Sequence, residues 1–195
     1  MFLETICIIN GKVQNIDAHI NRMRQTAEYF KFKAPVLPIL EELLTSDIKN
    51  TKVKCSIHYH NIIKNISFNS YIPREIYSLK LIKAHPDYAF KYSDRKVLEN
   101  LLDYREDCDE VLIIRDGFIT DTTFSNVVLQ KGDELFTPHC PILNGTKRQK
   151  LIKEGRISEK EIKVKSLKDY SHVYLINAML DIEDNISVPI DMINK

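Results

Sequence analysis

Residues 110–137 read EVLIIRDGFITDTTFSNVVLQKGDELFT and decide the fold class. They contain three short runs rich in apolar and β-branched residues, at 110–114, 124–130 and 134–137. The turn pairs Asp116-Gly117 and Gly132-Asp133 separate these runs, as expected for short strands joined by tight loops. The stretch therefore predicts the strand-rich part of an α+β fold.

Helical patterns lie on both sides of this stretch. Residues 96–104 precede it and predict a helix. After it, Leu143-Asn144-Gly145 leads into a helix that we expect over 146–154. Ser158 and Glu161 have the spacing of a capping box, which predicts the start of another short helix.

The first 68 residues predict a second α+β region. Strands are expected at 2–8, 53–59 and 62–68. Asp17 is expected to cap a helix, because short polar side chains bind the free N–H groups of a first turn. The apolar residues that follow recur at helical spacing: Ile20, Met23, Ala27 and Phe30. Residues 39–48 predict a second, shorter helix.

Residues 73–87 separate these two regions. The segment holds Pro73, Pro86 and a mixture of polar and apolar residues, so we expect a crossing segment there. The sequence thus predicts a small N-terminal α+β lobe over 1–85 and a larger C-terminal lobe over 86–195.

Composition limits the classes of partner. The formal net charge of +1 gives no long-range attraction to nucleic acid or to acidic membranes. No apolar run reaches the ~18 residues that a membrane span needs, so we expect a cytoplasmic protein. The four cysteines are scattered without a close pair, and we expect no metal site. Cys7 and Cys55 lie in apolar runs and are expected to be buried.

Three features could take part in catalysis or ligand binding, and each also has a plain structural explanation. Lys91 lies between Phe90 and Tyr92; desolvation there would make its amine nucleophilic, or its stem simply covers aromatic surface. Asp121 is a carboxylate between strands, or an ordinary turn residue. The loop 143–148 precedes a helix and suits a phosphate, to which Arg22 could donate, or it is a plain helix start.

Five short motifs occur in one order along the chain: Glu4-Thr-Ile, His19-x-x-Arg22, Lys91-x-x-x-Arg95, Gly117 to Asn126, and Leu143-x-Gly145-x-x-Arg148. Together they resemble the class IV aminotransferase family, the fold type IV enzymes that use pyridoxal 5′-phosphate (PLP). The resemblance extends from Phe2 to about Asp181. It implies the two-lobed α+β fold of D-amino-acid aminotransferase, with PLP in the cleft between the lobes.

The resemblance also implies a role for each matching residue. Lys91 corresponds to the catalytic lysine that bonds covalently to PLP and moves the substrate proton. Arg22 corresponds to the arginine at the PLP phosphate, and the backbone N–H groups of Thr146 and Lys147 correspond to the phosphate-binding turn. Asp121 stands where the family usually has a glutamate against the pyridine nitrogen.

The predicted activity follows from the lyase branch of the family. Asn177, in Leu-Ile-Asn-Ala, corresponds to an asparagine common near the end of that branch. The start at Met1-Phe2 is similar to compact lyase domains. We therefore predict a homodimeric lyase that acts on a small amino substrate, converting 4-amino-4-deoxychorismate to 4-aminobenzoate and pyruvate in folate synthesis. The alternatives are an aminotransferase for branched-chain or D-amino acids, and a non-catalytic protein with the same fold.

Overall fold

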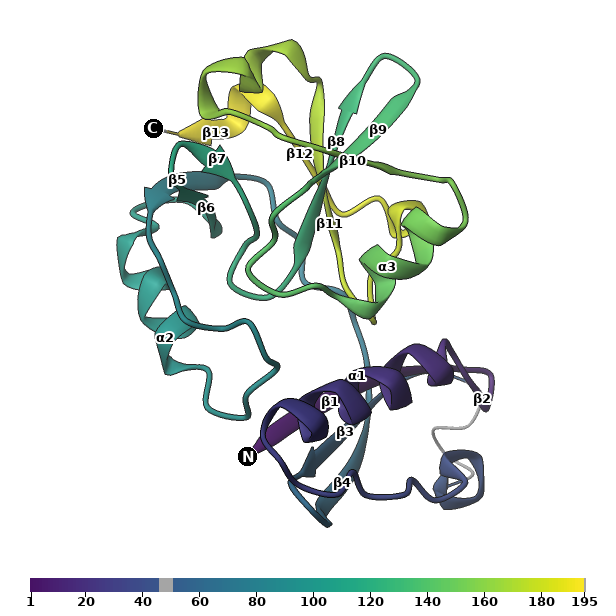
Figure 1. Cartoon of the computed structure of the whole chain (residues 1–195). Coiled ribbons are helices and arrows are strands. Elements are labelled where there is room, and N and C mark those ends of the chain that lie inside the picture. The colour runs from purple at the N-terminus through teal and green to yellow at the C-terminus, as the bar shows by residue number, and fades with distance from the viewer. Residues whose placement is uncertain (46–50, 195) are drawn as a thin grey trace. The chain divides into compact units, whose positions relative to one another are not determined.

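A computed structural model describes residues 1–45 and 51–194 (Figure 1). Contacts divide the chain into two compact units. Unit 1 comprises Met1–Pro73 and Phe90–Asp94, and unit 2 comprises Arg74–Ala89 and Arg95–Lys195. Both units combine strands with helices, which agrees with the predicted α+β class.

The sheet of unit 1 is antiparallel, with strand order β2-β1-β3-β4 among the described residues. The strands are β1 (Phe2–Ile9), β2 (Lys12–Val13), β3 (Lys52–Tyr59) and β4 (Ile63–Ser70). Buried and partly exposed residues alternate along β3, since successive side chains point to opposite faces. The buried side chains pack into one core, in which Cys55 joins Ile6, Ile8 and Ile57. Cys7 and Cys55 are buried, as predicted.

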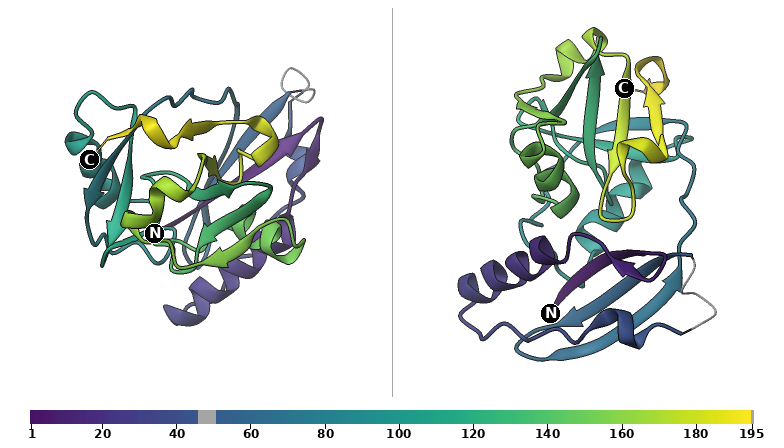
Figure 2. Two further views of the ribbon diagram at one scale, coloured as in Figure 1. Left: turned by 90° about the horizontal axis from the view of Figure 1, so that it is seen from above. Right: turned by 90° about the vertical axis from the view of Figure 1, so that its right-hand side faces the viewer.

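Helix α1 (Ile16–Tyr29) lies along one face of this sheet, as Figure 1 and the right-hand view of Figure 2 show. Its buried residues recur at intervals of three and four and form one stripe: His19, Arg22, Met23, Thr26 and Ala27. The predicted cap was wrong by two positions. The N-cap is Asn15, which has a left-handed backbone and no side-chain cap bond, whereas Asp17 lies in the first turn, where its charge complements the helix dipole.

The segment 90–94 belongs to unit 1 because it hydrogen bonds to the start of β1. The N–H of Leu3 donates to the carbonyl of Lys91 at 2.9 Å, and the N–H of Ser93 donates to the carbonyl of Met1 at 3.1 Å. Phe2 and Tyr92 form an antiparallel bridge. These bonds fix the backbone of Lys91 to unit 1. The lobe boundary expected at residue 85 would have assigned Lys91 to the C-terminal lobe.

Unit 2 contains two sheets in its described part, with strand orders β10-β9-β8-β11-β12 and β13-β5-β6-β7. The strands of the first are β8 (Asn126–Lys131), β9 (Glu134–Pro138), β10 (Ser158–Lys160), β11 (His172–Ile176) and β12 (Ser187–Pro189). Those of the second are β5 (Leu79–Lys83), β6 (Glu110–Arg115), β7 (Phe118–Ile119) and β13 (Ile193–Asn194).

The predicted crossing segment starts at the boundary of unit 2, which begins at Arg74, and it also contains the strand β5, which pairs in parallel with the buried strand β6. One prediction for unit 2 was wrong, and strand pairing is the reason. The helix predicted from Ser158 is strand β10, which pairs in parallel with β9. The three residues of β10 are exposed and have no apolar pattern, so only the partner strand determines their conformation.

Helices complete the two units. The predicted helix over 96–104 is α2 (Lys96–Glu99), continued by the 3₁₀ turn η2 (Asn100–Tyr104). Helix α3 (Thr146–Lys153) agrees with the prediction. The expected helix over 39–48 reduces to η1 (Leu40–Leu43), and its last three residues lie outside the described part. Three further 3₁₀ turns are η3 (Val164–Asp169), η4 (Ile182–Asp184) and η5 (Ile190–Met192). None of the described helices has the length and apolar character needed to cross a membrane.

Candidate active site

A carboxylate is buried beneath helix α1 in unit 1. Glu4 has no exposed surface, and its two oxygens bind the guanidinium of Arg22 side-on. Nε of Arg22 donates to Oε1 at 2.8 Å, and Nη2 donates to Oε2 at 2.5 Å. Nδ1 of His19 lies 2.6 Å from Oε2. The three side chains form one charged cluster in an otherwise apolar layer.

Local geometry explains why these residues meet. Glu4 is two residues from both Phe2 and Ile6, and in a strand that spacing places all three on the buried face. His19 and Arg22 are three residues apart on α1, so they project from the same side of the helix. The helix therefore presents two nitrogen donors to the one acidic side chain on that face.

Charge in this cluster shifts two pKa values. Burial alone would raise the pKa of Glu4, but the charge of Arg22 and the hydrogen bonds from His19 and Arg22 outweigh it and lower it to about 2. Burial lowers the pKa of His19; the bond and charge of Glu4 oppose this, while the charges of Arg22 and Lys91 add to it. The amine of Lys91 is thus within electrostatic range of His19.

Aromatic rings surround the backbone of Lys91. The ring centroid of Tyr92 lies 5.6 Å from that of Phe2, and the centroid of Phe90 lies 4.9 Å from that of Phe30. These neighbours belong to the apolar cluster around Phe2 and hold both flanks of Lys91 in place. Lys91 itself is half-buried. Unit 1 therefore brings together two of the predicted site residues, Arg22 and Lys91.

Asp121 occupies a buried position in unit 2. Its Oδ1 accepts a hydrogen bond from Nδ2 of Asn126 at 2.8 Å, and its Oδ2 accepts the backbone N–H groups of Ile142 and Leu143 at 2.7 and 3.0 Å. Burial raises the pKa of Asp121 to about 6, although each of these bonds favours the charged form. An ionised carboxylate has about four acceptor positions, so one position on Oδ1 is left for a further donor.

The loop held by Asp121 leads into helix α3. Nδ2 of Asn126 also donates to the carbonyl of Leu143, at 2.7 Å. Gly145 is the N-cap of α3 and brings no side chain to the helix start, and the first turn contains no acidic residue. A helix start of this kind favours an anion, because its N–H groups point outward and the helix dipole adds positive potential. The residues present thus suit a phosphate group at Thr146 and Lys147.

Gly145→Ala is expected to destabilise the protein by about 1–3 kcal/mol through overpacking. A Cβ at this position would lie 2.1 Å from Oδ1 of Asn126, whose amide is held by Asp121 and Leu143. The backbone of Gly145, with φ −67° and ψ 147°, suits any residue, so the effect is steric. Urea unfolding measures the loss.

The control for this substitution is the Asn126→Ala background, in which the obstructing oxygen is absent. Gly145→Ala should cost less there than in the wild type. Equal losses in both backgrounds would contradict the steric explanation.

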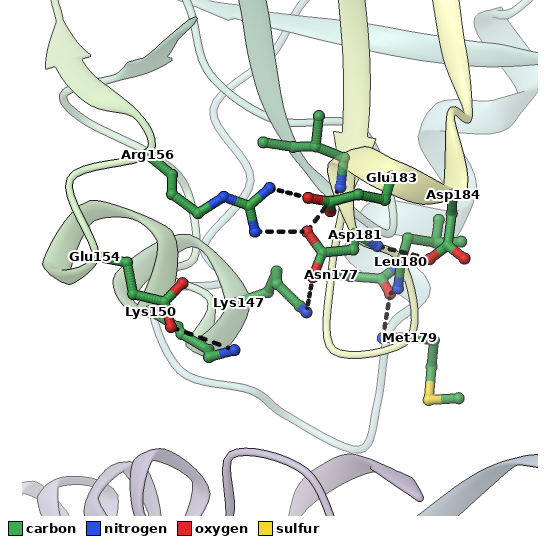
Figure 3. Close-up of polar contacts among 11 residues, drawn as sticks. Lys147, Lys150, Glu154, Arg156, Asn177, Met179, Leu180, Asp181, Glu183 and Asp184 are labelled. Atoms are coloured by element: carbon green, nitrogen blue, oxygen red, sulfur yellow. Dashed lines mark hydrogen bonds and ion pairs between the residues drawn. The ribbon is translucent and has the colours of Figure 1, made fainter. Parts of the chain in front are cut away.

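The first turn of α3 is tied to the chain after β11 by an ion-pair network (Figure 3). Nζ of Lys147 lies 2.5 Å from Oδ2 of Asp181, and Nη1 of Arg156 lies 3.6 Å from Oδ1. Arg156 also pairs with Glu183. Burial would raise the pKa of Asp181, but the bond from Lys147 and its charge help to lower it to about 2. The side chain of Lys147 therefore binds protein, and only its backbone N–H suits the predicted phosphate role.

Asn177 has a structural task close to this network (Figure 3). Its Oδ1 accepts the backbone N–H groups of Met179 and Leu180 at 2.8 and 3.1 Å. Its Nδ2 donates to the carbonyl of Phe124 at 3.4 Å. The side chain thus holds the turn that leads to Asp181. A direct contact between Asn177 and a cofactor stays a prediction.

The predicted site residues fall into two groups. Arg22 and Lys91 belong to unit 1. The other four belong to unit 2: Asp121, Thr146, Lys147 and Asn177. The sequence did not predict that Glu4 binds Arg22 or that Asn126 binds Asp121 and Leu143. For Glu4 a signal was present, because an acidic residue on the apolar face of a predicted strand indicates a buried charge that needs a partner.

Comparison with known proteins adds a family to this geometry. A family model described as amino-transferase class IV matches residues 93–183, which include all four predicted residues of unit 2. An uncharacterized protein of Haemophilus influenzae is 35% identical over 181 residues, which are 90% of this chain and 96% of that protein.

Solved structures agree with both the family and the fold. The crystal structure of a proposed 4-amino-4-deoxychorismate lyase from Haemophilus somnus 129PT is 32% identical, covers 91% of this chain and 95% of its own, and has a TM-score of 0.79. A hypothetical aminotransferase from Mycobacterium tuberculosis, in a PLP-bound form, is 18% identical over 98% of this chain and 80% of its own, with a TM-score of 0.79, and shows the fold alone. The α+β fold predicted as fold type IV is confirmed, and the chain belongs to the class IV aminotransferase family of enzymes.

Proposed function

We propose that the protein is a PLP-dependent lyase that converts 4-amino-4-deoxychorismate to 4-aminobenzoate and pyruvate. The observation that carries this proposal is the 32% identity, over 95% of its length, to the Haemophilus somnus protein, which is described as a proposed lyase for that substrate. The reaction needs no oxidant or second substrate, since the two products together contain all the atoms of the starting compound.

Six residues would hold the cofactor in this proposal. The guanidinium of Arg22 and the backbone N–H groups of Thr146 and Lys147 would bind its phosphate, and Lys91 would bond to it covalently. The glycine N-cap of α3 and the absence of an acidic residue in its first turn support the phosphate assignment. Asp121 would face the ring nitrogen through its remaining Oδ1 position, and Asn177 would support the turn beside α3.

The chemistry is divided between the cofactor and the chain. PLP supplies an electron sink for the charge that develops at the substrate carbon next to the amine. Nζ of Lys91 would remove the proton from that carbon and deliver it to the CH2 carbon of the leaving enolpyruvyl group, which thereby becomes the methyl group of pyruvate. Asp121 keeps a negative charge beside the ring nitrogen and so favours its protonated form. The side chains of Phe90 and Tyr92, which pack in the apolar cluster around Phe2, would hold the backbone that carries the amine of Lys91.

An aminotransferase that acts on branched-chain or D-amino acids is the second candidate. The family description and the fold shared with the Mycobacterium tuberculosis protein favour it. Such an enzyme would use the same lysine, but it would pass the amine on to a keto acid.

Product analysis separates the two activities. The PLP-loaded protein is incubated with 4-amino-4-deoxychorismate alone, and separately with a panel of amino acids with and without a keto acid. Mass spectrometry should find 4-aminobenzoate and pyruvate in the first incubation, at catalytic yield and without an acceptor. Turnover of amino acids that requires the keto acid, together with an unchanged chorismate derivative, would support the aminotransferase and reject the lyase.

A further inference from the structure

We propose that Glu4 is a positioning residue, which holds the guanidinium of Arg22 through both carboxylate oxygens in the orientation that binds the cofactor's phosphate. The inference rests on the proposed function, because that function assigns Arg22 to the phosphate. It adds a residue of the strand β1 that would not itself touch cofactor or substrate.

The geometry of the contact restricts Arg22. Two parallel bonds, from Nε to Oε1 and from Nη2 to Oε2, fix both the plane and the rotation of a planar guanidinium. The third nitrogen, Nη1, takes no part in that pair, so its direction follows from where Glu4 lies. Glu4 is fully buried, and its backbone is paired with Ile57 of β3, so the sheet and the surrounding side chains restrict its position.

The cluster is poorly explained by stability alone. Burying a carboxylate and a guanidinium removes both from water, and well-packed apolar residues of similar volume often serve stability as well or better. Phe2 and Ile6 show that this face of β1 accommodates apolar side chains. The position of Glu4 is better explained by the orientation that it imposes on a functional arginine.

Charge and orientation predict opposite effects when Glu4 is made neutral. Glu4→Gln removes a negative charge close to Arg22, and this change by itself would strengthen the binding of an anion. The same substitution leaves only one acceptor for the two guanidinium donors, so Arg22 loses its fixed plane. If positioning dominates, phosphate binding weakens despite the more positive potential.

The experiment measures the Kd of PLP by absorbance titration of the apo-protein. Four proteins form a cycle: wild type, Glu4→Gln, Arg22→Met and the double variant. We expect Glu4→Gln to raise the Kd of PLP about 10-fold, because a guanidinium that is no longer held in one plane makes a weaker charge-assisted hydrogen bond to the phosphate. In the Arg22→Met background, the added Glu4→Gln should leave the Kd unchanged, because Glu4 acts through Arg22.

A matched control comes from the same helix. Arg24 is exposed on α1, and Arg24→Met should leave the Kd of PLP unchanged. Thermal unfolding of each apo-variant shows whether it is folded. If Glu4→Gln does not fold, Arg22→Lys replaces it in the test, since a lysine keeps the charge but cannot form the fork. This variant should also bind PLP about 10-fold more weakly.

The outcomes distinguish the two proposals. A wild-type protein that binds no PLP contradicts the proposed function itself. Wild-type binding together with a tighter or unchanged Kd in Glu4→Gln overturns the positioning role alone, as does an equal effect of that substitution in both backgrounds. An unchanged Kd in Arg22→Lys overturns it as well. Weaker binding by Glu4→Gln that disappears without Arg22 supports the inference.

Discussion

Replacing Lys91 with alanine is expected to lower turnover by at least about 1000-fold, the upper part of the range for loss of a general acid–base group. The amine is the group that would bond to PLP and move the substrate proton, and alanine can do neither. The fold should survive, because the bonds that fix this segment involve the backbone of Lys91 and the side chains of Phe90 and Tyr92.

Two measurements check the Lys91 prediction. Borohydride reduction of the PLP-loaded wild type should attach the cofactor to Lys91, as identified by peptide mass, and no attachment should occur in Lys91→Ala. Lys64→Ala is the matched control, because Lys64 is an exposed lysine on β4 of the same unit. Undiminished turnover by Lys91→Ala would remove Lys91 from the mechanism. Cofactor that washes away from reduced wild type would favour the non-catalytic alternative.

Asp121→Asn is expected to reduce turnover by about 100- to 1000-fold, the range for loss of one aligned electrostatic contact at a reacting centre. The neutral amide cannot favour a protonated ring nitrogen as a carboxylate does. The bond from Nδ2 of Asn126 to Oδ1 would be lost, because an amide nitrogen cannot accept it. The amide oxygen can still accept the N–H groups of Ile142 and Leu143, and Nδ2 of Asn126 still donates to the carbonyl of Leu143, so the loop before α3 should keep its position. The Kd of PLP should therefore change much less than turnover.

The apo-protein offers a separate test of the buried carboxylate. The pKa of Asp121 is raised from 3.8 to about 6, so the folded state binds this proton more tightly than the unfolded state. Stability due to this group is therefore present below pH 3.8 and lost as the pH rises to about 6, by about 3 kcal/mol. Asp121→Asn should lack this decline, measured by urea unfolding between pH 4 and pH 7.

Asp133→Asn serves as the control, since Asp133 is exposed in the turn between β8 and β9. It should change neither turnover nor the pH profile. If Asp121→Asn keeps full turnover while losing the pH-dependent decline, Asp121 holds the loop only and has no part in the chemistry.

Several features of the protein were predictable from the order of residues alone. The strands β1, β3 and β6 followed from their apolar runs, and α1 and α3 followed from periodicity and from the glycine before α3. These elements form where local preference and burial agree. The order of five short motifs identified the family, which the comparisons confirm.

Contacts between distant residues decided the rest. Glu4 and Arg22 are 18 residues apart, and Asp121 and Ile142 are 21 apart, so no local pattern shows that they bind each other. The strand β10 has three exposed polar residues and forms only because β9 offers its free edge. A backbone with weak preference takes the conformation that satisfies its hydrogen bonds, and a buried charge takes the partner that compensates its desolvation. Both conditions are set by the folded chain as a whole, which is why only the tertiary structure decided the partner of Glu4 and the conformation of β10.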